Sequence, residues 1–382
     1  MPFKTYNKSA RLNIEDRHAE LTPEKSTRSN ESITEEILSN LEEVIKQDEL
    51  YFEEVIRQPL KSDIENILGT PFHWIVEFPE LTIKNEYGQP TVSFDIIVGN
   101  PPYGNLLNGN EKLLTDWYET SEINEVSAQF IERQLQLLAD DGYYGNIISL
   151  RFVYQNDAYP IHDYMRDALE NIQIACFAHR PEPIFENAVV RTAIVSGKKN
   201  EDVRSDIKTS KLIMLDSETR EQKLSDIEYT SVDGLLLREK IGAKERDGYE
   251  ILPKVGGHKD LLTKMKDKSE RTLNDIRNET STKYPNYRKR GGGYWLGYAP
   301  ENEWGDLTSI EPLYYESELH RDAAFILVNS NLYYVFYLTY SNFRNFDFGH
   351  IDKFPFPFET NEELQEYSDE IEKYKENCGN PI

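Results

Sequence analysis

A short polar motif stands directly after a stretch that is typical of a buried strand. The residues Asn100, Pro101, Pro102 and Tyr103 follow the run 92–98, which is short and rich in β-branched side chains. Proline has a fixed φ and no N–H, so the two prolines hold the backbone rigid. The Asn100 side-chain oxygen and the Pro101 carbonyl can therefore point outward together as two hydrogen-bond acceptors. Two acceptors at a fixed spacing suit an amino group.

The ring of Tyr103 adds a second kind of contact, because it offers a flat face on which another ring can stack. The motif therefore predicts a site that grips a planar base bearing an exocyclic amine. Ligands of open α/β sheets bind at the carboxyl ends of strands, and that is where this motif is expected to lie. The alternative is a proline turn that merely ends a strand.

Strands and helices alternate around the motif, which is typical of a mostly parallel sheet with helices on both faces. Apolar spacing predicts a helix over 126–138, and short apolar runs predict further strands. We therefore expect an α/β fold. The predicted elements after that helix are a strand at 144–150, a helix around 162–169, and strands near 172–177 and 189–195.

The charge of the chain is strongly acidic, with 43 Lys and Arg against 68 Asp and Glu in 382 residues, a net charge of −25. This disfavours a general nucleic-acid coat protein, because like charge repels phosphate. The sign reverses locally: residues 254–290 hold eleven basic residues against five acidic ones. Lys283, Arg288, Lys289 and Arg290 in this stretch predict a loop that contacts phosphates. The alternative is a solvated charged surface.

The two cysteines, Cys176 and Cys378, exclude a disulfide framework and a cysteine-rich zinc site. We expect a reducing, cytoplasmic location, and the N-terminus lacks the apolar stretch of a secretion signal. The histidines have no metal-like spacing, so no metal site is predicted. The uncharged segment 323–343 is long enough to span a membrane, but its many Asn, Ser and Tyr side chains favour a helix buried inside a domain.

Several stretches resemble one enzyme family. The sequence 94–103, FDIIVGNPPY, looks like the catalytic motif of amino-group DNA methyltransferases of the adenine-specific type. The segment 72–80 is similar to the one that precedes this motif in large methylases of restriction–modification systems. The stretches 325–332 and 349–356 resemble the C-terminal part of a TaqI-type specificity domain. The likeness covers roughly residues 70 to 358.

The resemblance implies that a target adenine is flipped out of duplex DNA and methylated on its exocyclic amine by S-adenosylmethionine. Asn100 and the Pro101 carbonyl, in the rigid turn completed by Pro102, would accept hydrogen bonds from the amine. Tyr103 would stack on the base together with Phe185, which matches a family position with that role. For Phe185 the alternative is an ordinary aromatic on a loop. No metal and no covalent intermediate is needed.

One part of the family pattern is missing from the chain. The family needs an acidic residue followed by a Gly-x-Gly turn at its first strand, but the sequence 291–293 is the only Gly-x-Gly and follows a basic stretch. Glu77 is the one residue that we assign to the cofactor, with a solvated or capping carboxylate as the alternative. We therefore expect a partial Rossmann-like methyltransferase sheet without its cofactor-binding half, which a second chain could supply.

The expected function is that of an adenine-specific DNA methyltransferase acting on double-stranded DNA, as a split subunit or a remnant. The alternatives are a non-catalytic DNA-binding specificity subunit and a protein resembling release-factor glutamine methyltransferases. The expected segments are a helical N-terminal arm at 1–70, the target-base half of the catalytic domain at 71–200, a linker region at 201–250, an α+β specificity domain at 251–360 and an acidic tail at 361–382.

Overall fold

The computed structural model describes residues 81–84, 90–107, 112, 115–155, 158–185, 190–200, 204–237, 240–241, 244–245, 251–291, 295–305, 308–343 and 345–377. The predicted N-terminal arm, the segment 72–80 with Glu77, and Cys378 lie outside these residues. The chain divides into two compact units. The first comprises Met1–Ile148, Pro160–Glu170 and Ser196–Ser205, and the second comprises Ser149–Tyr159, Asn171–Val195 and Asp206–Ile382.

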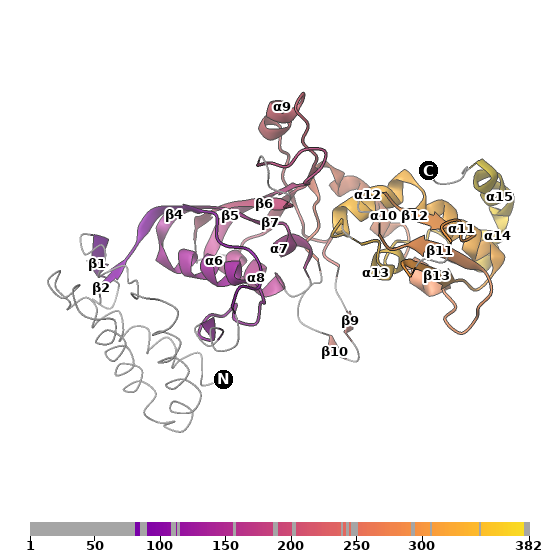
Figure 1. The fold of residues 1–382 in the computed structure, drawn as a ribbon, viewed down its shortest axis with the longest axis horizontal. Coiled ribbons are helices and arrows are strands. Elements are labelled where there is room, and N and C mark those ends of the chain that lie inside the picture. The colour runs from indigo at the N-terminus through magenta and orange to yellow at the C-terminus, as the bar shows by residue number, and fades with distance from the viewer. Residues whose placement is uncertain are drawn as a thin grey trace, which may run out of the picture. The chain divides into compact units, whose positions relative to one another are not determined.

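The largest sheet has six strands in the order β3-β4-β6-β5-β7-β8 (Figure 1). Strand β3 is parallel to β4 and β5 is parallel to β7, whereas β8 runs antiparallel to β7. The predicted α/β class is therefore correct, with a sheet that mixes both orientations. The strands are β3 Phe94–Gly99, β4 Leu138–Ser149, β5 Leu169–Phe177, β6 Thr192–Lys199, β7 Ile207–Ile213 and β8 Thr230–Ser231.

In the first unit, helix α6, Val126–Leu137, covers one face of β4 (Figure 1). Its apolar stripe is buried, with Ile131 and Leu135 at 0% exposure. The side chain of Asn146 on β4 donates a hydrogen bond to Oε1 of Gln134 on α6 over 2.5 Å. Helix α8, Tyr159–Ala168, follows the four-residue helix α7, Arg151–Tyr154. Helices α6 and α8 lie close to the predicted positions, whereas α7 was not predicted.

Strand β3 is the edge strand of the six-stranded sheet. Ile96 and Val98 on β3 are 64% and 77% exposed, and Tyr143 of β4, which pairs with Ile96, is 60% exposed. Side chains two residues apart share a face of a strand, so these three lie on the face opposite Tyr144 and Asn146. Before β3, a two-stranded antiparallel sheet pairs β1, Thr82–Lys84, with β2, Pro90–Val92.

The second unit contains strands where a linker region was expected. Residues 207–213 form β7 beside β5, and Ala175, Phe177, Ile213 and Leu215 make a buried cluster between the two strands and the segments that follow them. Most of β7 is buried, and the two exposed positions in it are Lys208 and Lys211. The segment expected as a linker therefore includes a strand of the main sheet, and the two compact units divide between Ser205 and Asp206. Helix α9, Arg220–Ser225, and the short pair β9, Lys240–Ile241, and β10, Lys244–Glu245, complete this region.

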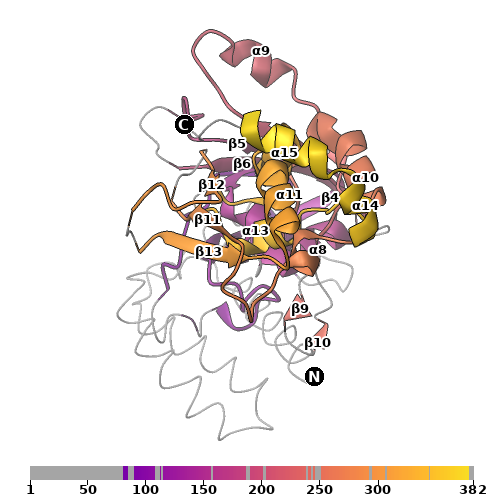
Figure 2. The same cartoon turned by 90° about the vertical axis from the view of Figure 1, so that its right-hand side faces the viewer.

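The C-terminal part of the second unit packs helices on a three-stranded antiparallel sheet in the order β12-β11-β13. Helix α11 contacts β11, β12 and α15, and Figure 2 shows it beside them. The strands are β11 Pro285–Lys289, β12 Gly297–Ala299 and β13 Ile310–Tyr314. The helices are α10 Lys259–Asp267, α11 Glu318–Val328, α12 Asn331–Tyr340, α13 Phe348–Asp352, α14 Asn361–Glu366 and α15 Ser368–Asn377, with short 3₁₀ turns at Gly256–His258 and Leu273–Ile276.

The uncharged segment 323–343 forms two helices rather than the single buried helix that its composition predicts. The break lies at Asn329 and Ser330. The Ser330 hydroxyl accepts a hydrogen bond from the Tyr333 N–H over 3.2 Å, and this cap begins α12. Burial was predicted correctly, since Tyr333 and Tyr337 are 0% exposed. Among the described residues, no helix is long and apolar enough to cross a membrane.

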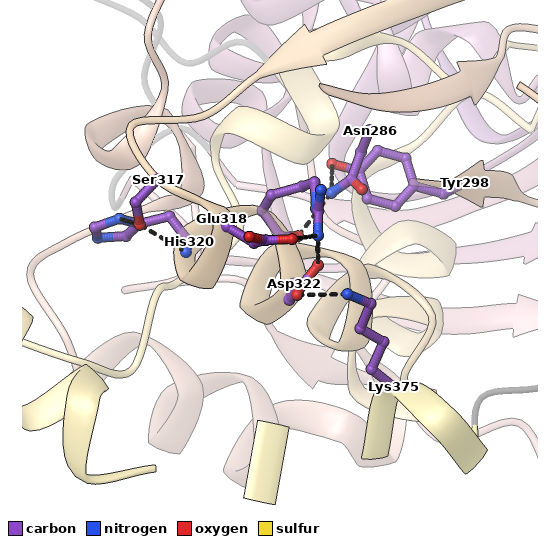
Figure 3. A network of polar contacts seen from close by, with 8 residues as sticks. Asn286, Tyr298, Ser317, Glu318, His320, Asp322 and Lys375 are labelled. Atoms are coloured by element: carbon purple, nitrogen blue, oxygen red, sulfur yellow. Dashed lines mark hydrogen bonds and ion pairs between the residues drawn. The ribbon is translucent and has the colours of Figure 1, made fainter. Parts of the chain in front are cut away.

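Helices α14 and α15 make up the described part of the acidic tail, and α15 has polar contacts with α11 (Figure 3). Lys375 on α15 forms an ion pair with Asp322 on α11, with Nζ and Oδ2 2.7 Å apart. On the other side of α11, the Asn286 amide of β11 donates to the Arg321 carbonyl over 2.8 Å. One helix therefore connects the tail to the sheet.

Candidate functional site

The predicted motif forms the turn that leaves the carboxyl end of β3. Asn100 and Pro102 are exposed, Pro101 is buried and Tyr103 is half-buried. Gly104, which follows, has a φ of 95°, a conformation that residues with a Cβ rarely adopt. The chain therefore exposes the Asn100 carboxamide at a strand end and then turns sharply.

The Tyr103 hydroxyl is tied to its own turn. It lies 2.7 Å from Oδ1 of Asn100 and 3.2 Å from the Ile147 carbonyl of β4, and it donates to these acceptors. Burial, with a smaller effect of the Glu125 carboxylate, raises the pKa of Tyr103 above its usual value, so the hydroxyl keeps its proton. A carboxamide oxygen has two lone pairs, so Asn100 can still accept a second hydrogen bond.

Glu125, at the start of α6, fixes the end of this turn. Its carboxylate is buried and accepts a hydrogen bond from the Gly104 N–H over 3.2 Å, while the Val126 N–H donates to the Gly104 carbonyl over 3.2 Å. Gly104 is therefore held from both sides at the start of α6. Sequence reasoning missed Glu125, and the only signal was an acidic residue immediately before a helix.

Gly99, the last residue of β3 before the motif, is packed closely against β4 and α6. A Cβ on Gly99 would lie 2.7 Å from Oδ1 of Asn146 and 2.9 Å from Nε2 of Gln134. Only glycine lets β4 and α6 approach the end of β3 this closely. The rigid base of the site therefore comes from residues well separated in sequence, whereas the exposed acceptor comes from the contiguous motif.

Phe185 belongs to the second unit and is 40% exposed, on the loop that follows β5. The carbonyls of Pro183 and Ile184, just before it, accept hydrogen bonds from the Arg220 guanidinium of α9. This anchors the loop and leaves the ring accessible. Its assignment to base stacking stays a prediction.

Arg288 is a correction to the predicted DNA-binding set. Its side chain is only 3% exposed; the guanidinium is ion-paired with Glu311, donates to the Phe346 carbonyl and lies 3.7 Å from the centre of the Phe348 ring. A guanidinium enclosed in this way has no face left for a phosphate. Burial lowers the pKa of Arg288 below its usual value.

The other predicted basic residues are more accessible. Lys283 is exposed, Lys289 is half-buried, and the Arg290 side chain is 54% exposed with its Nε 3.7 Å from a carboxylate oxygen of Asp347. Lys289 differs from Arg288 because successive side chains of β11 point to opposite faces, whereas Lys283 and Arg290 lie outside the strand. These three residues stay candidates for phosphate contact.

The resemblance stated from the sequence is confirmed by comparison with protein families. Residues 10–185 match the model of the Eco57I restriction–modification methylase family. The match begins well before residue 70, so the likeness extends into the segment predicted as a separate arm. It ends at the loop that carries Phe185.

One curated protein is similar in sequence to this chain. A protein of Methanocaldococcus jannaschii, named as a type II restriction enzyme and methyltransferase, is 26% identical over 252 residues, which are 63% of this chain and 19% of that protein. The chain therefore spans about a fifth of the length of this relative.

Two solved structures show weak similarity to this chain. A modification subunit of a type I restriction enzyme from Vibrio vulnificus is 12% identical, with 42% of this chain and 37% of that chain covered and a TM-score of 0.33. The type IIG restriction endonuclease BpuSI is 12% identical, with 73% and 49% covered and a TM-score of 0.31.

Proposed function

We propose that this chain is the target-base and DNA-recognition part of an adenine-specific DNA methyltransferase in a restriction–modification system. The family match supports a DNA methylase of such systems. We infer adenine specificity from one observation: Asn100, in the Asn-Pro-Pro-Tyr turn at the end of β3, is exposed. Double-stranded DNA is the proposed substrate and S-adenosylmethionine the proposed methyl donor.

The proposed chemistry of the chain's own residues is limited to holding the base. Asn100 Oδ1 and the Pro101 carbonyl accept hydrogen bonds from the exocyclic amine of a flipped adenine. That draws the nitrogen lone pair out of conjugation with the ring, and Tyr103 stacks on the base, a contact worth about 1–3 kcal/mol. Phe185 is the proposed second stacking residue, and Lys283, Lys289 and Arg290 are the proposed phosphate contacts.

The described residues do not fit S-adenosylmethionine. None of the six strands of the main sheet is followed, within the described ranges, by an acidic residue and a Gly-x-Gly turn. We therefore derive no step through the methyl donor from these residues. The proposed source of that half of the site is another polypeptide or a part of the protein outside the described residues, where Glu77 also lies.

The edge of the sheet supports a split site. Ile96, Val98 and Tyr143 present three large apolar side chains to solvent on one face of β3 and β4. An unpaired strand edge with an apolar face beside it is a surface that proteins normally cover. A cofactor-binding half that extends the sheet past β3 would bury this surface.

One measurement tests the proposed reaction. Purified chain, alone and together with the product of its neighbouring reading frame, is incubated with duplex DNA and S-adenosylmethionine carrying a labelled methyl group. We expect label on adenine, its loss in Asn100→Ala, and its retention in Asn105→Ala, an equivalent change at an exposed residue just beyond the turn. Tight binding of S-adenosylmethionine by the chain alone, measured by calorimetry, would contradict the split site.

The alternative function is a non-catalytic DNA-binding specificity subunit. The missing cofactor turn favours it, since a chain without that turn could still recognise DNA. DNA binding without label, whichever partner is added, would support this alternative over the methyltransferase.

A further inference from the structure

The three-stranded sheet β12-β11-β13 has one face against helix α11 and one face that points away from it. Asn286 and Arg288 of β11 are 0% and 2% exposed, and the Asn286 amide donates to the Arg321 carbonyl of α11 over 2.8 Å. Successive side chains of a strand alternate between its faces, so Tyr287 and Lys289 point to the other side. We call that side the outer face of this sheet.

Two tyrosines are neighbours on the outer face. Residues directly opposite each other in an antiparallel pair share a face, and Pro312 of β13 lies opposite Tyr287. Tyr314 stands two residues further along β13, so it lies on the same face, diagonal to Tyr287 at a backbone spacing of about 7–8 Å. Both tyrosines are half-buried.

A tryptophan lies over the same face at the other end of β11. Gly297 of β12 pairs with Lys289, and a Cβ on this glycine would lie 3.0 Å from the Cβ of Lys289 and 3.1 Å from Cζ2 of Trp304. The indole of Trp304 therefore lies beside Lys289, in space that a side chain at Gly297 would fill. Trp304 is half-buried, and Trp295, just before β12, is 69% exposed.

The tyrosines of the outer face differ from the buried tyrosines nearby in their hydrogen bonds. The hydroxyls of Tyr298 and Tyr315 bond to each other, and the Asn286 amide donates to the Tyr298 hydroxyl over 3.3 Å. Within the described residues, the side chains of Tyr287 and Tyr314 make no hydrogen bond and no contact with another ring. Their rings and hydroxyls are therefore free to meet a ligand.

The charges around the outer face favour bases over phosphates as the main ligand groups. Lys289 has no ion pair among the described residues, so it can meet one phosphate. Glu301 and Glu303, in the loop that leads to Trp304, are exposed and repel phosphates. Duplex binding depends mainly on neutralising phosphates, whereas stacking on a ring depends on the flat face of a base.

We propose that the outer face of this sheet binds unpaired bases of single-stranded DNA, which stack on Tyr287, Tyr314 and Trp304. Aromatic side chains on a sheet surface can stack on successive bases of a single strand, because every base has a flat face. Lys289 contacts a phosphate of the same strand. The site uses no residue of the turn at Asn100 and goes beyond the proposed function; only the choice of DNA over RNA rests on that function.

Binding of fluorescent oligo(dT) to the full chain, measured by anisotropy without methyl donor, tests the proposal. Tyr287→Ala removes one stacking ring, so its affinity should fall by about 5- to 150-fold. Tyr287→Phe keeps the ring and should bind like the parent chain. Tyr374→Ala removes a tyrosine of α15 that is 61% exposed; it is the matched control and should also bind like the parent chain.

A second probe separates stacking from contacts with the strand's backbone. An abasic oligomer of the same length has phosphates but no bases, so the parent chain and Tyr287→Ala should bind it with equal affinity. Tyr314→Ala repeats both measurements at the second ring, which keeps the test valid if one variant folds poorly.

Three results would overturn the proposal. They are no binding of oligo(dT) by the parent chain, an equal loss of affinity in Tyr287→Ala and Tyr287→Phe, and an equal loss in Tyr287→Ala for duplex and single strand. The last result would make the outer face a duplex-binding surface. Methyl transfer does not enter the measurement, so failure of the proposed reaction would leave this result interpretable.

Discussion

The hydroxyl of Tyr103 donates a hydrogen bond to Oδ1 of Asn100 over 2.7 Å. The acceptor proposed for the adenine amine is therefore already engaged by the ring proposed to stack on the base. An incoming amine must use the second lone pair of Oδ1 or displace the hydroxyl. The two proposed functions of Tyr103, stacking by its ring and a hydrogen bond by its hydroxyl, can be separated by substitution.

Tyr103→Phe keeps the ring and removes the competing donor, so we expect methyl transfer to be retained or modestly increased. Tyr103→Ala also removes the stacking surface, worth about 1–3 kcal/mol, which corresponds to a loss of about 5- to 150-fold in kcat/KM. Both are measured in the assembly that transfers methyl groups. If Tyr103→Phe lost as much activity as Tyr103→Ala, the hydroxyl rather than the ring would be the functional group.

Glu125 holds Gly104 behind the motif, and this can be tested without any activity. Glu125→Ala removes the buried carboxylate that accepts from the Gly104 N–H. A hydrogen bond to a charged group is worth about 1.5–3 kcal/mol, so exchange of the Gly104 amide hydrogen should speed up by about 10- to 150-fold. Glu122→Ala, at an exposed position nearby, should leave that rate unchanged. An unaltered rate in Glu125→Ala would mean that the turn is rigid without its carboxylate.

Sequence reasoning could propose a candidate site where the relevant residues are contiguous in the chain. Asn100 to Tyr103 could be found because the motif and the strand before it are adjacent in the chain. Glu125 and the close approach of Gln134 and Asn146 to Gly99 could not, because they depend on how α6 packs against β4. The sequence predicted the residues of the motif, but it did not predict the packing of α6 and β4 that supports them.

The same limit explains the errors elsewhere in the chain. Arg288 and Lys289 look equivalent as neighbouring charges, but a strand sends one inward and the other outward. The charged residues of 201–250 made β7 hard to recognise, because two exposed lysines, Lys208 and Lys211, interrupt its buried positions. Ser330 ends one helix and begins another through a cap that composition alone does not reveal.

Arg288 and Arg290 are expected to respond to substitution in opposite ways. Arg288→Ala leaves the Glu311 carboxylate, which is 33% exposed, and the Phe346 carbonyl without their partner. Losing hydrogen bonds to a charged group costs about 1.5–3 kcal/mol in the free energy of unfolding. Arg290→Gln should change that free energy by less than about 0.5 kcal/mol, because its side chain is 54% exposed. Urea unfolding of the two variants provides the comparison.

DNA binding completes the contrast between the two arginines. If Arg290 contacts a phosphate, Arg290→Gln lowers the slope of log K for duplex DNA binding against log salt concentration by about 0.9. A stable Arg288→Ala variant with weakened DNA binding would restore Arg288 to the binding set and contradict its structural role.

Lys254 is a fully buried cation whose environment predicts an unusual pH dependence. Its Nζ donates to the Ser341 carbonyl over 3.1 Å and lies 5.1 Å from the centre of the Phe343 ring. Burial lowers the pKa of Lys254 to about 7, and the nearby Cys176 thiol acts weakly in the other direction. His350 also lies within reach of its charge, and burial lowers the pKa of that imidazole to about 4, so it stays neutral above pH 6.

Lys254→Met should therefore stabilise the protein most at low pH. An unfolded lysine titrates near pH 10.4, so between pH 7 and about 10.4 the unfolded state binds more protons and the free energy of unfolding of the parent chain rises with pH. Below pH 7 both states are protonated and the full cost of burying the ammonium remains. The gain in the free energy of unfolding from Lys254→Met should shrink by up to about 5 kcal/mol from pH 6 to pH 10.4, at 1.36 kcal/mol per pKa unit.

Urea unfolding of the variant and the parent chain across this pH range measures the gain. Lys264→Met, at an exposed position, should differ from the parent chain by the same free energy at every pH. A constant difference for Lys254→Met as well would show that Lys254 keeps its ordinary pKa in the folded protein.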